Sequence, residues 1–183
     1  MESRQIFERA DRRLVRRFLR TGDERSFRQL YSRHTPGMYP LALRLVGGSE
    51  ADAQDAIQET WIRACKRLER FEWKSSLRTW LTGILINCIR ESNRERERRQ
   101  EEELQDDAAT AVSSQPLTRI DLEQVIARLP DGYRHVLTLH DISGYTHEEI
   151  GVLLEITAGT SKSQLYHARR ALRSLLREEP RTP

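Results

Sequence analysis

The clearest chemistry in this sequence lies near its C-terminal end, on one polar face of a helix that we expect to run to about residue 177. The opposite face carries an apolar stripe at helical spacing. Lysine and arginine neutralise phosphates or contact guanine edges, glutamine can read adenine, and hydroxyls near a helix start hold phosphates. The polar face therefore predicts a DNA-reading surface made of Thr160, Lys162, Ser163, Gln164, Tyr166, His167, Arg169, Arg170 and Arg173.

A short helix before this one supplies the element that would position it. Thr146 and Glu149 have the spacing of a capping box, which marks a helix start, and a tight turn is expected over residues 156–159. A capped short helix, a turn and a longer basic helix match the helix-turn-helix plan. An ordinary amphipathic surface helix would show the same stripe, but the capped helix and the turn favour DNA binding.

A second set of candidates lies in the first half of the chain, in a helix–loop–helix pattern that ends in an arginine-rich run. The first helix has a capping-box-like start at Ser49 and carries acidic and amide side chains beside an apolar stripe. The second helix follows a loop over residues 70–76. Ser75 or Ser76, at the end of this loop, can cap the helix. Its basic end, residues 90–99, has nothing apolar to bury, so we expect it to project outward.

Charge distribution adds a hint about the partner. Residues 1–99 carry 22 Lys/Arg against 14 Asp/Glu, whereas residues 100–121 carry one Arg against six acids. A basic half of this kind points to a polyanionic partner. A solvated arginine-rich surface would give the same charge, so this asymmetry supports nucleic-acid binding without establishing it.

The sequence argues against an enzyme, a metalloprotein and a membrane protein. Two lone cysteines, Cys65 and Cys88, fit a reducing cytoplasm better than a disulfide framework or a metal knuckle. The histidines lack metal-ligand spacing, and there is neither a phosphate-cradling glycine loop nor a Gly-x-Ser-x-Gly elbow. No apolar run reaches the ~18 residues of a membrane span, and the arginine-rich start lacks a secretion signal. We expect no cofactor, no metal and no small-molecule substrate.

The apolar pattern predicts an all-α fold of two small helical domains. Strand-like alternation is absent and helical stripes recur along nearly the whole chain. Pro36 and Pro40 are expected to interrupt the helix that contains them. The composition divides the chain into an N-terminal helical extension (1–23), a first domain (24–99), an acidic flexible linker (100–119) and a helix-turn-helix domain (120–179).

Two motifs together resemble the extracytoplasmic-function sigma factors of bacteria, a group of the sigma-70 family. The C-terminal motif, Thr146-His-Glu-Glu-Ile-Gly with Ile156-Thr-Ala-Gly-Thr-Ser-Lys-Ser-Gln-Leu-Tyr-His-Ala-Arg-Arg-Ala-Leu, is similar to their helix-turn-helix domain. The N-terminal motif, Asp52-Ala-Gln-Asp-Ala-Ile-Gln-Glu59 with Trp61, then Ser76-Leu-Arg-Thr-Trp-Leu81 and Asn87, is similar to their first sigma domain. The motifs occur in the family's order, so the resemblance covers roughly residues 24–99 and 120–177.

The resemblance implies a transcription initiation factor that binds the RNA polymerase core and directs it to promoters. The basic C-terminal helix would read the −35 element as duplex DNA in the major groove. An acidic face would dock on the clamp helices of the largest polymerase subunit, through Asp52, Asp55, Gln58 and Glu59. The loop and basic helix would open and hold the −10 element, through Phe71, Trp73, Lys74, Ser75, Arg78, Asn87, Arg90 and Arg94.

The resemblance implies further partners and a place of action. The flap of the second-largest polymerase subunit would be a second contact. The protein would act in the cytoplasm, and an inhibitory anti-sigma factor would bind it, in some cases holding it at the inner membrane face. Trp73 is either a stacking surface for an unpaired base or a partly buried loop anchor. Trp61 and Trp80 lie on apolar stripes and are expected in the core.

Some residues depart from the family's pattern, and an alternative function stays open. Ser161 stands where an apolar residue is usual, and its buried hydroxyl would bond a carbonyl one turn back. Gly83 lies inside a helix, where glycine costs roughly 1 kcal/mol against alanine. The alternative is a free-standing dimeric helix-turn-helix regulator, which would leave the acidic face and the arginine-rich helix end without a role.

Overall fold

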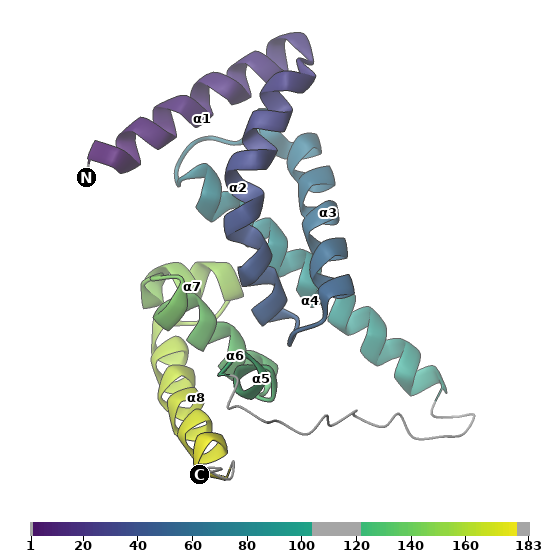
Figure 1. The fold of residues 1–183 in the computed structure, drawn as a ribbon, viewed down its shortest axis with the longest axis vertical. Helices are drawn as coiled ribbons and strands as arrows, with labels where there is room; N and C mark the ends of the chain where they lie inside the picture. Colours follow the sequence, from purple (N-terminus) through teal and green to yellow (C-terminus); the bar gives the residue numbers. More distant parts are fainter. Residues whose placement is uncertain (1, 104–121, 179–183) are drawn as a thin grey trace, which may run out of the picture.

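The computed structural model describes residues 2–103 and 122–178, and every regular element in these two ranges is a helix (Figure 1). The first helical module (2–103) contains α1 (Glu2–Thr21), α2 (Glu24–Leu45), α3 (Glu50–Arg67), the 3-10 helix η1 (Leu68–Arg70) and α4 (Leu77–Glu103). The second helical module (122–178) contains α5 (Leu122–Ala127), α6 (Asp131–Leu137), the π-helical turn η2 (Thr138–Ile142), α7 (His147–Leu154) and α8 (Ala158–Glu178). The all-α prediction is confirmed.

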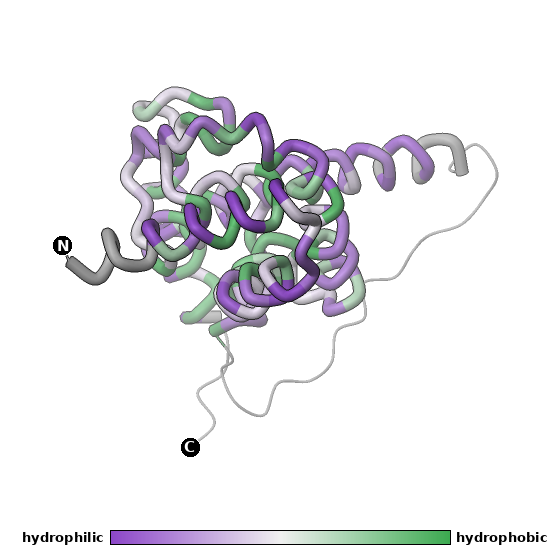
Figure 2. Tube along the Cα trace, turned by 90° about the horizontal axis from the view of Figure 1, so that it is seen from above, coloured by the Kyte–Doolittle hydropathy of each residue, from purple (hydrophilic) through white to green (hydrophobic). Residues whose placement is uncertain are grey.

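Helix α4 continues well beyond the residues that it buries. Its C-terminal part extends away from the rest of the molecule and is mostly hydrophilic (Figure 1, Figure 2). The helix continues through Glu103, into the segment expected to be the acidic linker. The rest of that segment lies outside the described residues.

The expected helix caps are present. The hydroxyl oxygen of Ser49 accepts from the backbone N–H three residues later at 3.3 Å, and that of Ser76 does the same at 3.1 Å. Thr146 and Glu149 form the full reciprocal capping box at the start of α7. Each cap satisfies an orphan N–H of the first helical turn, a contribution of about 1 kcal/mol.

The prediction that prolines interrupt the second helix is wrong. Helix α2 runs without a break through Pro36 and Pro40. Both prolines lie on its exposed side, where water can satisfy the carbonyls that lose an intrahelical partner. The opposite side buries Leu30, Met38, Leu41, Ala42 and Leu45, and this packing outweighs the missing hydrogen bonds.

The tryptophans lie close to their expected places in the core. Trp61 is buried, and its Nε1–H donates to the hydroxyl of Thr35 at 3.0 Å. Trp80 is half-buried and packs against the core of the first module.

Close packing does not explain the glycine at position 83. A Cβ atom there would lie 3.5 Å from the Leu153 side chain, which is an ordinary van der Waals contact.

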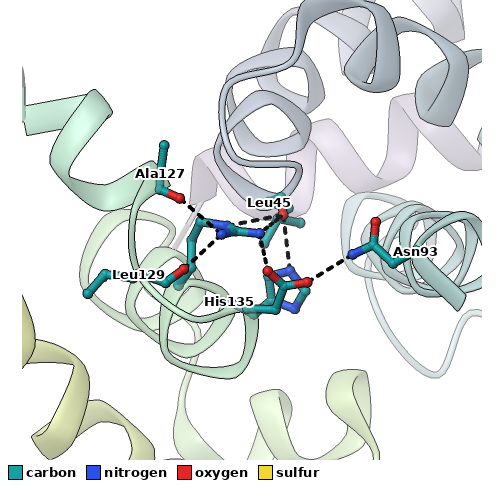
Figure 3. A network of polar contacts seen from close by, with 7 residues as sticks. Leu45, Asn93, Ala127, Leu129 and His135 are labelled. Atoms are coloured by element: carbon teal, nitrogen blue, oxygen red, sulfur yellow. Dashed lines mark hydrogen bonds and ion pairs between the residues drawn. The ribbon is translucent and has the colours of Figure 1, made fainter. Parts of the chain in front are cut away.

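The two modules meet where α2 ends. Gly47 and Gly48 terminate this helix with positive φ angles of 75° and 92°, which glycine adopts without steric cost. The last helical carbonyl, that of Leu45, accepts hydrogen bonds from Arg134 Nε at 3.3 Å, Arg134 Nη2 at 3.2 Å and His135 Nε2 at 3.1 Å (Figure 3). Helix α6 of the second module therefore caps the C-terminus of α2, where the helix dipole favours a cation.

Candidate nucleic-acid interface

Helix α8 presents the predicted DNA-reading face to solvent. The Oγ1 of Thr157 accepts from the backbone N–H of Thr160 at 2.9 Å and so fixes the start of the helix. Gln164 is half-buried and lies beside Gly132 of α6. The other predicted contacts are all exposed: Thr160, Lys162, Ser163, Tyr166, His167, Arg169, Arg170 and Arg173.

The turn between α7 and α8 depends on a glycine. The N–H of Ile156 donates to the carbonyl of Gly151 at 3.0 Å, and Glu155 ends α7 in the left-handed conformation. A Cβ atom at Gly151 would lie 2.8 Å from the backbone oxygen of Ile156, closer than such atoms approach in proteins. The helix-turn-helix angle that exposes α8 therefore requires glycine at this position.

The hydroxyl of Ser161 is satisfied by a histidine and not by the expected carbonyl. Ser161 is fully buried, and its Oγ lies 2.9 Å from Nδ1 of His147 in a hydrogen bond. The His147 ring also stacks on His140, with ring centroids 4.5 Å apart. Partial burial, together with the nearby His140 and Lys162 charges, lowers the pKa of His147. The hydroxyl and the imidazole thus join α7 to α8 behind the predicted DNA-reading face.

Arg169 has a partner that the sequence did not indicate. Its Nε and Nη2 donate to the two carboxylate oxygens of Asp141 at 2.9 and 2.6 Å, a bidentate arrangement. Hydrogen bonding from Arg169 lowers the pKa of Asp141, and the same pair raises the pKa of Arg169. Arg169 is thereby oriented from the π-helical turn η2, whereas Lys162 and Arg170 have no carboxylate partner in the described part of the chain.

Part of the predicted −10 set lines a hollow between α4 and α7, called here the α4–α7 groove. Lys74, Ser75 and Asn87 lie on one wall of this groove of about 570 Å³. Glu149 and Glu155 of the second module lie on the other wall. The groove therefore places the predicted strand-holding residues opposite acidic side chains of the same chain.

The remaining predicted −10 residues are distributed along the first module. Arg90 is half-buried and donates to Glu155 across the module boundary at 3.0 Å. Arg78 and Arg94 are exposed, with Arg78 on a separate hollow that also includes Tyr145. The structure thus gathers Lys74, Ser75, Asn87 and Arg90 at the α4–α7 side and leaves Arg78 and Arg94 outside that cluster.

The two aromatic residues of the loop before α4 form a tilted pair, and Phe71 stacks on Trp80 of α4. Phe71 is buried, with its ring centroid 4.7 Å from that of Trp80 and 4.7 Å from that of Trp73. Trp73 is half-buried and has a φ of 59°, in the left-handed region. Its ring faces α1, where the guanidinium carbon of Arg12 lies 4.7 Å from the ring centroid.

Three of the predicted polymerase-binding residues line one groove. Asp52, Asp55 and Glu59 line a groove between α3 and α4, called here the acidic groove. Gln58 lines an apolar groove between α2 and α3 that includes Tyr31 and Trp61. Because Gln58 follows Asp55 by three residues on α3, the two side chains are neighbours on the helix surface.

Arg63 organises the acidic groove and was not singled out from the sequence. It donates to Glu59 of α3 and to Glu91 of α4, both at 2.6 Å, and these bonds raise the pKa of its guanidinium. Arg96 pairs with Asp52 at 2.8 Å across the same groove. The i,i+4 spacing of Glu59 and Arg63 was a usable signal, whereas the pairs with α4 depend on the tertiary structure.

Three further features of the described ranges concern metal binding, thiol reactivity and membrane spans. Within residues 2–103 and 122–178, no group of three or more His, Cys, Asp or Glu side chains could hold a metal ion. Burial raises the pKa of the Cys65 and Cys88 thiols, which makes them less reactive. Among the helices described, none is long and apolar enough to cross a membrane.

Family comparisons give the class of protein that this fold and surface define. Residues 30–99 match the model for Sigma-70 region 2, and residues 119–172 match the model for Sigma-70, region 4. The two regions cover more than half of the chain and fall on the two helical modules. The chain is therefore a member of the sigma-70 family of transcription factors.

Curated relatives narrow the class further. The chain is 32% identical to the RNA polymerase sigma-H factor of Pseudomonas aeruginosa, over 92% of this chain and 96% of that protein. It is 31% identical to the ECF RNA polymerase sigma factor SigE of Mycolicibacterium smegmatis, over 85% of this chain but 65% of that protein. It is 28% identical to the ECF RNA polymerase sigma-E factor of Escherichia coli, over 88% and 92%. The chain belongs to the extracytoplasmic-function sigma factors, as the two sequence motifs indicated.

Solved structures agree with this assignment. The sigma factor RpoE of Bartonella quintana, solved in complex with the anti-sigma factor NepR, has a TM-score of 0.68 at 25% identity, covering 84% of this chain and 98% of that one. CnrH, solved in complex with the cytosolic domain of CnrY, has a TM-score of 0.65 at 26% identity, covering 93% and 99%. The arrangement of helices is thus shared with sigma factors over most of the chain.

Proposed function

We propose that this sigma factor binds the RNA polymerase core and directs it to promoters by using α8 to read the −35 element in the major groove. The single observation that carries the proposal is the exposed polar and basic face of α8, on a helix-turn-helix within a matched sigma-70 region. Lys162, Arg170 and Arg173 would neutralise phosphates, and Gln164 and Arg169 would contact base edges. Thr160 and Ser163, near the helix start, would hold a phosphate.

The first module would hold the opened −10 strand. Lys74, Ser75 and Asn87 line the α4–α7 groove, and Arg90 lies beside it. The cationic and polar side chains of this wall suit an unpaired strand, because cations contact the backbone while polar and aromatic groups contact the bases. Arg78 and Arg94, exposed at either side, would extend the track for the backbone.

The acidic groove would dock on the clamp helices of the largest polymerase subunit. Asp55 is exposed, while Asp52 and Glu59 are half-buried and held in place by Arg96 and Arg63. Fixed carboxylates lose little side-chain entropy on binding. Gln58, three residues after Asp55 on α3, would belong to the edge of this contact, and the second module would contact the flap of the second-largest subunit.

The modules must separate for these contacts to form together. In the structure, Glu149 of α7 and Glu155, the residue that follows α7, face the predicted strand-binding residues, and Arg90 is paired with Glu155. A DNA backbone in the α4–α7 groove would replace these carboxylates with phosphates. An anti-sigma factor that holds the modules together would therefore block −10 binding, and the cytoplasm, where polymerase and DNA reside, would be the place of action.

Run-off transcription tests the proposal. Purified protein is mixed with core polymerase on fragments of the parent genome, and transcripts that begin at defined sites are expected only when both are present. The double variant Lys162→Ala/Arg170→Ala should lose most of the product while keeping core binding in a pull-down. Promoter-dependent initiation that is equal without the protein would overturn the proposal, and a dimeric mass in size-exclusion chromatography would favour the free-standing regulator instead.

A further inference from the structure

The imidazole of His167, on the predicted DNA-reading face of α8, is held between two tyrosine rings. Its plane lies 18° from that of Tyr133 of α6, and the two ring centroids are 6.0 Å apart. This geometry is an offset stack. The ring of Tyr166, the preceding residue on α8, forms a T-shaped contact with the imidazole at 79°, with centroids 5.4 Å apart. His167 is exposed, yet these contacts on two sides restrict the orientation of its ring.

Tyr133 is itself fixed by the core of the second module. It is half-buried and packs against the buried apolar residues, and α6 as a whole packs against α8 (Figure 1). On α8, Leu165, two residues before His167, and Ala168, the residue after it, are both buried. The stack therefore joins an exposed imidazole to an aromatic ring that the core holds in place.

His167 lies in line with residues that we expect to contact phosphates. Ser163 precedes it by four positions and Arg170 follows it by three, so the three side chains are neighbours on the helix surface. Ser163 and Arg170 are both exposed. Contacts to the sugar–phosphate backbone orient a protein on duplex DNA. A group placed between two such contacts lies beside the same backbone.

The charged groups that face α8 from the neighbouring helices have partners other than His167. These pairs are Asp131 with Arg134, Glu123 with Arg44, His135 with the Leu45 carbonyl, Asp141 with Arg169 and His140, Glu149 with the Thr146 N–H, and His147 with Ser161, beside Glu148. On α8 itself, Arg170 is the charged residue one turn from the imidazole. Among the described residues, the ring contacts of His167 are thus the two tyrosines, and a DNA phosphate would be the anion beside it.

We propose that Tyr133 is a positioning residue that holds the His167 imidazole toward a backbone phosphate, and that the protein binds duplex DNA more tightly when this imidazole is protonated. Histidine changes its charge between about pH 5 and pH 8. The protonated ring donates from both nitrogens and pairs with an anion. A cation within about 6 Å of a tyrosine ring centroid is also attracted to the ring face. The inference rests on the proposed function, since it needs α8 to lie against DNA.

The expected pH dependence follows from the charge of the imidazole. A histidine side chain of ordinary acidity is neutral at about pH 8 and mostly protonated at about pH 5.5. One additional phosphate contact steepens the salt slope of duplex binding by about 0.9. We therefore expect the contact of His167 to tighten DNA binding about fivefold at the lower pH, the upper range for an exposed ion pair.

Binding of a mixed-sequence DNA duplex to the full-length protein at the two pH values tests the proposal. His167→Gln keeps a polar side chain but cannot gain the charge, so it should lose this gain in affinity and in salt slope. Tyr133→Leu removes the ring that holds the imidazole and should reduce the gain, whereas Tyr133→Phe keeps the ring and should retain it. Melting curves at both pH values show whether each variant is folded, and the His167→Gln result stands whatever the fold of Tyr133→Leu.

A double-mutant cycle shows whether Tyr133 acts through His167. In the His167→Gln background, Tyr133→Leu should leave the pH dependence unchanged. The matched control background is His140→Gln, whose ring stacks on His147 instead, and there Tyr133→Leu should still reduce the gain.

Two results would overturn the proposal. One is a pH dependence that His167→Gln leaves intact. The other is a loss in Tyr133→Phe as large as that in Tyr133→Leu, which would make the tyrosine hydroxyl the contact. Run-off transcription by the wild-type protein separates the two levels of inference: transcription without the His167-dependent gain refutes this proposal alone, whereas the gain without transcription refutes the sigma function.

Discussion

Arg134 joins the two modules, and its truncation should destabilise the protein measurably. Its guanidinium donates to the backbone carbonyls of Leu45, Ala127 and Leu129 at distances between 2.8 and 3.3 Å (Figure 3). In Arg134→Ala, the Leu45 carbonyl keeps its bond from His135, but the carbonyls of Ala127 and Leu129 lose their side-chain donor. An unsatisfied buried acceptor costs about 1–3 kcal/mol. The Ala127 bond is only partly buried, so we expect a total loss of about 3 kcal/mol.

Thermal unfolding followed by circular dichroism measures this loss. A change of about 3 kcal/mol corresponds to a midpoint lowered by roughly 10 °C or more for domains of this size. Arg134→Lys, which keeps the charge but not the planar fork, should fall between Arg134→Ala and the wild type. Arg177→Ala removes an exposed arginine and should stay within about 0.5 kcal/mol. If Arg134→Ala melts within two or three degrees of Arg177→Ala, as judged against the scale above, the hydrogen-bond argument is wrong.

Four other outcomes follow from the structure. Lys162→Ala and Arg170→Ala should each lower the salt slope of promoter binding by about one per lost phosphate contact, and an unchanged slope would show that this face does not touch DNA. Burial lowers the pKa of His135, so the unfolded chain binds its proton more tightly than the folded one. The stability that this neutral group supports is therefore present above about pH 6.5 and is lost as the pH falls. Melting curves from pH 7 to 5 should show a decline that His135→Gln reduces, and an equal decline in the variant would contradict this. Glu59→Lys should lose core polymerase in a pull-down while its melting curve shows a folded protein, and retained core enzyme would refute the docking assignment. Gly151→Ala should destabilise the helix-turn-helix by about 1–3 kcal/mol, since a Cβ there meets the backbone oxygen of Ile156 at 2.8 Å, and wild-type melting would disprove the steric argument.

The local features of this protein were predictable because they depend on neighbours in sequence. A capping box needs only Thr146 and Glu149, and a buried stripe such as that of α8 needs only helical spacing. The exposed face of α8 followed from the same spacing. The prolines of α2 do not follow their local tendency to break a helix, because burial of the opposite side of α2 decides the outcome.

Contacts between elements could not be read from the sequence. Asp141 and Arg169 are 28 positions apart, and Leu45 and Arg134 are 89 apart. The hydrogen bond between His147 and Ser161 likewise depends on the angle between α7 and α8. Nothing in the local pattern gives such pairs, because they form only when helices pack at particular angles.

The sequence by itself determined the helices, their caps, the family and the basic face of α8, since each depends on residue type at short, regular spacing. Only the tertiary structure decided how the functional residues are grouped. It placed Asp52, Asp55 and Glu59 in the acidic groove and Gln58 in the apolar groove between α2 and α3, and it set Trp73 against α1. It also set α7 opposite the predicted strand-binding residues Lys74, Ser75 and Asn87. The physical reason is that these groupings depend on the packing of helices far apart in the chain.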